Sequence, residues 1–165
     1  MSFLIAAVGA VLAALIETSV LPELRLNLNL VLTFALVSGM LLSVEEGLTW
    51  AFLGGLALDI LTPGVRALGS TTLCLLLVVG AGLLIARIVQ PPRVLTVVLS
   101  VFALTYLYQA LLLVLLAATA NVGLSGWSFT SVTVIAILNA LIAGIAGRAT
   151  RTFSARLKPA EHSLR

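Results

Sequence analysis

Charged residues are scarce in this 165-residue chain: they make up 9% of it, whereas 61% of the residues are hydrophobic. A soluble domain carries about 25% charged residues, because its surface faces water. So few charges cannot cover a water-facing surface of this size. The composition therefore excludes a soluble globular domain, argues against nucleic-acid binding, and predicts a protein surrounded by lipid.

Cysteine and histidine are each present once, as Cys74 inside an apolar run and His162 in the polar C-terminal segment. One cysteine cannot form an internal disulfide, and a single histidine with no cysteine near it does not support a zinc site. With one histidine and six acids, the sequence holds no phosphate-binding loop, no HExxH motif and no Ser/His/Asp set. We therefore expect no catalysis, no cofactor and no metal.

Long apolar segments are what the sequence does contain. In a bilayer the backbone must satisfy its own hydrogen bonds, either in helices or in a closed barrel. Barrel strands alternate apolar and polar residues, but Leu73–Ile88 and Val94–Leu104 are apolar on all sides. We predict an all-α integral membrane protein with about six transmembrane helices, at Ser2–Leu21, Leu28–Val44, Gly47–Leu61, Leu68–Val89, Val94–Thr119 and Trp127–Ala149.

The first segment lacks the basic start of a signal peptide, so we expect it to be retained. The second and third are joined only by Glu45 and Glu46, which predicts a tight cytoplasmic hairpin, with a re-entrant pair as the alternative.

Basic residues predict the orientation, because cytoplasmic loops carry an excess of Lys and Arg. Six spans place Arg25 and Arg66 on the outer side and, on the other, Arg87, Arg93, Arg148, Arg151, Arg156, Lys158 and Arg165. Both termini should then be cytoplasmic; a five-span alternative moves the N-terminus outside. We divide the chain into a transmembrane bundle at 1–150 and a basic cytoplasmic tail at 151–165. The basic residues Arg148, Arg151, Arg156 and Lys158 should attract anionic lipid, and docking of a cytosolic protein is the alternative.

Two acids fall within the predicted spans, Glu17 and Asp59. Asp59 lies near the outer end of the third span, where it meets the negative end of the helix dipole. We expect a positive group to compensate it, either Arg66 or the backbone amides of Gly69, Ser70 and Thr71. The result would be a polar clasp that shapes the outer loop for a partner or a ligand; the alternative is a carboxylate solvated at the headgroup level. No chain of acids or histidines crosses the membrane, which argues against a proton relay.

Small residues recur every four positions and predict close helix packing in lipid. They are Ala6, Ala10 and Ala14 on the first span, and the pairs Ala140–Gly144 and Ala143–Gly147 on the last. These ridges serve either internal packing or a partner. Beside them, Asn139 should hydrogen-bond to another helix, near Tyr106, Tyr108 or Gln109.

The stretch Gly54–Leu61, with Leu68 and Gly69 after it, resembles a pattern of the rod shape-determining MreD family. Gly55, Asp59 and Gly69 match that pattern, and the Asn139 helix with its basic tail is similar to the family's last helix. One departure is that the family often has a proline before its second helix, where this chain reads Arg25-Leu26-Asn27-Leu28-Asn29.

This resemblance implies a non-catalytic scaffold of the bacterial cell-elongation machinery, in the inner membrane. The implied partners are MreC, RodA and its transpeptidase, and the implied role is cell shape and lateral peptidoglycan synthesis, with no small-molecule substrate. The family's fold is similar to that of the substrate-binding subunits of energy-coupling-factor transporters. An importer's solute-binding subunit is therefore the alternative, in which the Ala6–Ala10–Ala14 ridge would dock the transporter's transmembrane subunit.

Overall fold

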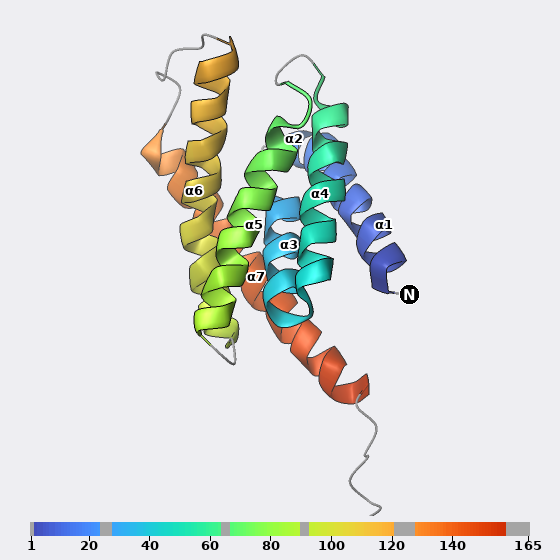
Figure 1. The fold of residues 1–165 in the computed structure, drawn as a ribbon. Helices are drawn as coiled ribbons and strands as arrows, with labels where there is room; N and C mark the ends of the chain where they lie inside the picture. Colours follow the sequence, from blue (N-terminus) through green and yellow to red (C-terminus); the bar gives the residue numbers. More distant parts are fainter. Residues whose placement is uncertain (1, 24–27, 64–66, 90–92, 121–127, 158–165) are drawn as a thin grey trace, which may run out of the picture.

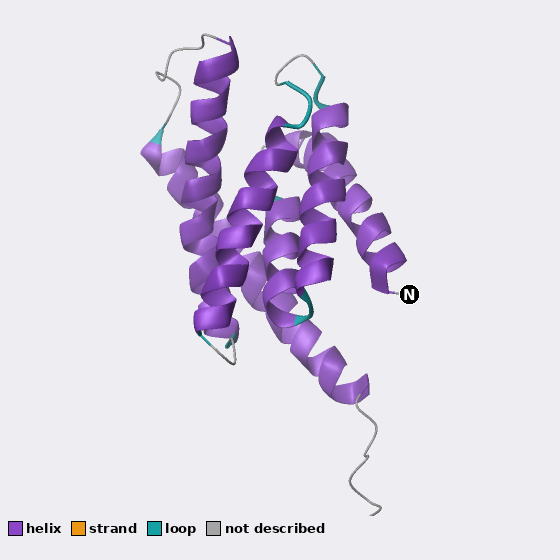
Figure 2. Ribbon diagram, viewed as in Figure 1, coloured by secondary structure: helices purple, strands orange, loops and turns teal. Residues whose placement is uncertain are grey.

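The described part of the chain consists of helices and short connections. The computed structural model describes residues 2–23, 28–63, 67–89, 93–120 and 128–157, and within them it contains helices and no strand (Figures 1 and 2). The first helical segment is continuous, and consists of α1 (Ser2–Leu15), the π-helical turn η1 (Ile16–Val20) and α2 (Leu21–Glu23). The later helices are α3 (Leu30–Leu41), α4 (Val44–Leu61), α5 (Ser70–Ile88), α6 (Val94–Ala120) and α7 (Phe129–Leu157).

Four helical segments are long and apolar enough to cross a membrane: Leu4–Glu23, Ser70–Ile88, Val94–Ala118 and Phe129–Thr152. The chain is therefore a multi-pass helical membrane protein, and its six helical segments fit the predicted number. The two central helices are shorter or more polar than the rest. With 12 residues, α3 is about 18 Å long, well short of about 30 Å of hydrocarbon. Helix α4 has 18 residues but carries Glu45, Glu46 and Asp59.

Helix α3 lies in the middle of the bundle and packs against α1, α4, α5, α6 and α7 (Figure 1). Nine of its twelve residues are buried. Glycines on its neighbours make room for it: a Cβ at Gly54 would lie 2.4 Å from the Val31 side chain, and one at Gly82 would lie 2.5 Å from Leu36. Because protein surrounds it, α3 is apolar on all sides without having to reach both faces of a bilayer.

The α3–α4 hairpin is tighter than predicted. Its connection is Leu42–Ser43, so the prediction that Glu45 and Glu46 form the loop is wrong: both lie in the first turn of α4. The Ser43 side chain accepts a hydrogen bond from the Glu46 backbone N–H at 3.2 Å, an N-cap that starts the helix there. Two carboxylates near this end suit the positive pole of the helix dipole.

Glycine also sets the distance between the two helices of this hairpin. A Cβ on Gly47 would lie 2.5 Å from the Gly39 Cα atom, so the backbones touch at this crossing.

The ends of the helices alternate between the two ends of the bundle. Figure 1 shows the start of α1, the α3–α4 turn, the end of α5, the start of α6 and the end of α7 toward one end. Helix α7 continues to Leu157, past the predicted end of the span at Ala149, and projects beyond the other helices. Position 151 is therefore inside a helix that continues from the predicted span.

Candidate functional site

Asp59 is a buried carboxylate at the C-terminal end of α4, with 4% of its surface exposed. Its Oδ2 atom accepts hydrogen bonds from the backbone N–H of Gly69 at 3.0 Å and of Thr72 at 3.2 Å, and from the Thr72 hydroxyl at 2.9 Å. Its Oδ1 atom accepts one from the Thr71 N–H at 3.1 Å. We call Asp59 and these donors the Asp59 clasp. The clasp joins the end of α4 to the start of α5.

Two glycines bring the carboxylate to this position. One turn before Asp59, a Cβ on Gly55 would lie 2.6 Å from the Thr72 Cα. The backbones of α4 and α5 therefore approach so closely here that no side chain fits between them. Gly69 caps α5 with φ +89°, in the left-handed region that favours glycine. The positive end of the α5 dipole then faces the carboxylate, which offsets its unfavourable place at the negative end of α4.

The structure shows which of the groups predicted to compensate Asp59 are bonded to it. Of the three predicted amides, those of Gly69 and Thr71 donate to the carboxylate. The Ser70 N–H bonds to the Ala67 carbonyl instead, and Thr72, which was not predicted, donates twice. The alternative of a carboxylate solvated among headgroups is wrong, because Asp59 is buried. Arg66 lies outside the described residues.

Asn139 forms a second polar junction, fully buried between three segments of the bundle. Its Oδ1 atom accepts the backbone N–H of Asn29 at 3.1 Å, just before α3, and its Nδ2 donates to the Thr105 hydroxyl of α6 at 3.3 Å. The bond to Thr105 reaches the predicted helix, at the residue directly before Tyr106. The Tyr106 hydroxyl bonds to Thr133 instead, at 2.9 Å.

The small residues pack inside the chain's own bundle. Ala6, Ala10 and Ala14 are 5%, 0% and 0% exposed, and α1 packs mainly on α4. This arrangement agrees with internal packing and leaves no outward-facing ridge of these three residues to dock a transporter subunit.

On α7, the predicted small residues also face other helices. Ala140 and Ala143 are 9% and 0% exposed, and a Cβ at Gly144 would make an ordinary contact with Val98 at 3.5 Å.

Glu17 lies in the π-helical turn η1 and reaches across to the start of α3. Its Oε2 atom accepts the backbone N–H of Val31 at 3.1 Å. The adjacent Thr18 hydroxyl donates to the Ala14 carbonyl at 2.9 Å, a bond that competes with the regular helical ladder and accompanies the local π-helical geometry. Glu17 thus ties the first helical segment to α3.

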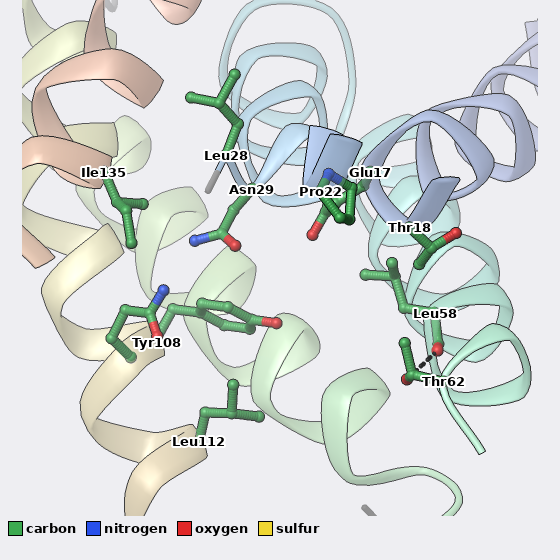
Figure 3. Close-up of a pocket in the computed structure, with 11 residues that line it drawn as sticks. Glu17, Thr18, Pro22, Leu28, Asn29, Leu58, Thr62, Tyr108, Leu112 and Ile135 are labelled. Atoms are coloured by element: carbon green, nitrogen blue, oxygen red, sulfur yellow. Dashed lines mark hydrogen bonds between the residues drawn. The ribbon is translucent and has the colours of Figure 1, made fainter. Parts of the chain in front are cut away.

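A cavity of about 420 Å³ opens beside Glu17, between the first helical segment, α3, α4, α6 and α7 (Figure 3). The scarcity of polar residues in the sequence gave no reason to expect it. Its lining mixes polar and apolar side chains: Glu17, Thr18, Pro22, Leu28, Asn29, Leu58, Thr62, Tyr108, Gln109, Leu112 and Ile135. The separate polar residues of the sequence meet here because the end of the first helical segment, the start of α3 and the end of α4 converge beside the middle of α6.

The basic residues of α5 and α7 that the structure describes lie at the opposite end of the bundle from this cavity. Arg87 is in the last turn of α5, while Arg148 and Arg151 are exposed on the C-terminal part of α7. Arg156 belongs to the last turns of α7, and Lys158 lies outside the described residues.

Within the described ranges, no group of three or more His, Cys, Asp or Glu side chains is placed to hold a metal ion. Comparison of the chain with protein-family models, with curated proteins and with solved structures finds no match.

Proposed function

We propose that this chain is a non-catalytic scaffold subunit of the bacterial cell-elongation machinery, of the MreD kind, in the cytoplasmic membrane with both termini in the cytoplasm. Its task would be to hold MreC, and through it RodA and its transpeptidase, in the complex that directs lateral peptidoglycan synthesis and cell shape.

The observation that supports this proposal is the Asp59 clasp. Gly55, Asp59 and Gly69 are the residues on which the resemblance to MreD rests, and they meet at one contact between α4 and α5. Such a contact fixes the connection between the two helices, which is what a binding surface for a partner requires. The clasp does not itself provide a reactive group: among the described residues, the four donors to the carboxylate come from α5 or its N-cap.

Depletion and complementation in the native cell test the proposal. Loss of the protein should turn rods into spheres, and a tagged copy should restore rods and co-purify MreC from detergent-solubilised membranes. A copy with Asp59→Leu should restore neither, whereas Glu45→Gln, which removes an exposed acid from the same helix, should restore both. Normal rods in depleted cells, or purification without MreC, would refute the assignment.

The cavity favours a second function, a solute-binding subunit of an energy-coupling-factor-type importer. Such a subunit needs a polar pocket between its helices, and a cavity lined by Glu17, Asn29 and Gln109 supplies one. Affinity purification separates the two functions: an ATPase pair with a transmembrane coupling subunit in place of MreC would establish the importer.

A further inference from the structure

The cavity beside Glu17 has the dimensions and the mixed lining of a small-molecule site. Its volume of about 420 Å³ falls within the range of about 300 to 1,000 Å³ that is usual for ligand pockets. Leu28, Leu58, Leu112 and Ile135 provide apolar walls, and polar groups from four separate segments interrupt them.

One polar group at this cavity lacks a partner. The Asn29 Nδ2 atom is buried and has no hydrogen bond within the described part of the chain. The backbone of the same residue is fully used, because its N–H donates to Asn139 and its carbonyl accepts from Thr33. The Asn29 backbone is therefore fixed while its carboxamide faces the cavity (Figure 3). A buried amide donor without an acceptor is costly, so an acceptor on a bound molecule would stabilise it.

The charges around the cavity restrict what that molecule can be. None of the described residues that line it is basic, and Glu17 is acidic, so an anion would be repelled in a medium of low dielectric constant. The Glu17 carboxylate already accepts the Val31 N–H at the positive end of α3, which reduces its attraction for a cation. Elsewhere on the wall of the cavity, Gln109 can donate and accept, and the Thr62 hydroxyl, which donates to the Leu58 carbonyl, can accept.

We propose that this cavity binds a small uncharged molecule that joins an apolar ring or chain to a carbonyl group, with the carbonyl accepting from Asn29 Nδ2. The site is independent of the Asp59 clasp, since the two share no residue. A scaffold could be regulated through it, and an importer could load its solute there.

Benzamide, benzamidine and benzoate test this proposal, because they share one ring and differ in charge. Binding of each radiolabelled compound to the full chain in nanodiscs is measured by equilibrium dialysis, with empty nanodiscs as the blank for partition into lipid. Benzamide should bind above the blank, and benzoate should not. Binding of benzoate as strong as that of benzamide, preference for benzamidine, or no binding above the blank would each overturn the proposal.

Variants place the binding in the cavity. Leu112→Trp fills it and should abolish benzamide binding, whereas Leu107→Trp on the lipid-facing side of the same helix, 41% exposed, should leave binding unchanged. Asn29→Leu should weaken binding about tenfold, the effect of losing one hydrogen bond to a ligand. Undiminished binding in Asn29→Leu and Leu112→Trp would show that the compound lies elsewhere. The three-compound comparison needs no variant, and the assay needs no partner, so its result is separate from the test of the scaffold.

Discussion

Asp59 accepts four hydrogen bonds from the start of α5, and we expect the fold to depend on it for that reason. Asp59→Leu keeps an apolar side chain of similar size but leaves the amides of Gly69, Thr71 and Thr72 without an acceptor. Each buried unsatisfied donor costs about 1–3 kcal/mol, so we expect a loss of about 3 kcal/mol or more. Reversible unfolding in mixed micelles, followed by tryptophan fluorescence, measures it.

The matched control for Asp59 is Glu45→Gln, since Glu45 is an exposed acid on the same helix. It should change the free energy of unfolding by less than about 0.5 kcal/mol, as surface substitutions usually do. Equal effects of the two substitutions would mean that the charge, and not the hydrogen bonds at α5, is what the fold requires.

These two residues also show what sequence reasoning reached and what it missed. The negative end of the α4 dipole at Asp59 was enough to predict a compensating positive group. The backbone amides of Gly69, Ser70 and Thr71 were among the candidates. Thr72 was missed because its role depends on how α4 and α5 cross, which spacing along one chain does not give. The same is true of Asn139: its need for a partner was evident, but Thr105 and the Asn29 backbone become its neighbours only in the assembled bundle.

The contact between α4 and α5 depends on the absence of a side chain at Gly55. Gly55→Ala places a Cβ 2.6 Å from the backbone of Thr72, so the two helices must separate, and we expect a loss of about 1–3 kcal/mol. Gly80→Ala, on α5, is the control, because a Cβ there meets nothing within 4 Å. It should be neutral or slightly stabilising. Thermal unfolding of both variants in one detergent gives the comparison; equal melting temperatures would remove the close contact as an explanation.

Asn139 connects α7 to the start of α3 and to α6. We expect this junction to contribute more to stability than the Tyr106–Thr133 hydrogen bond, which also joins α6 to α7. Asn139→Leu removes two hydrogen bonds at a fully buried site and leaves the Asn29 N–H without its acceptor. We expect a loss of about 1–2 kcal/mol, in the upper range of interhelical hydrogen bonds in membranes.

Tyr106→Phe is the comparison for Asn139→Leu, because the Tyr106–Thr133 bond is only partly buried. It should cost about 0.6 kcal/mol, the average for such bonds. The reverse order in unfolding experiments would contradict the role given to the Asn139 junction.

Helix types and most boundaries follow from apolar length, but the centre of the bundle does not. The prediction placed the second span at Leu28–Val44, long enough to cross most of a bilayer, whereas α3 covers Leu30–Leu41. A helix surrounded by lipid and a helix surrounded by protein have equally apolar sequences. Hydropathy could therefore not reveal that other helices surround α3. The acidic pair Glu45 and Glu46 was taken as a loop because of its charge, while the Ser43 cap that places it inside α4 is a local hydrogen bond.

At the level of the whole molecule, the two ends of the bundle differ in character. The end with the α3–α4 turn carries Arg87, Arg148 and Arg151, and the other end carries the Asp59 clasp and the cavity. The positive-inside rule predicts that the basic end lies in the cytoplasm and that the clasp and the cavity face the outside.

Two single-cysteine variants test this orientation in a Cys74→Ala background. Leu68→Cys replaces a residue that is 76% exposed between α4 and α5, and Leu42→Cys replaces one that is 50% exposed in the α3–α4 turn. In intact spheroplasts, a membrane-impermeant maleimide should label Leu68→Cys and should label Leu42→Cys only after the membrane is permeabilised. The two sites lie at opposite ends of α4. The reverse labelling pattern would therefore mean that the protein has the opposite orientation in the membrane. Labelling of both sites before permeabilisation would instead mean that α4 does not separate two aqueous compartments, as in a re-entrant pair.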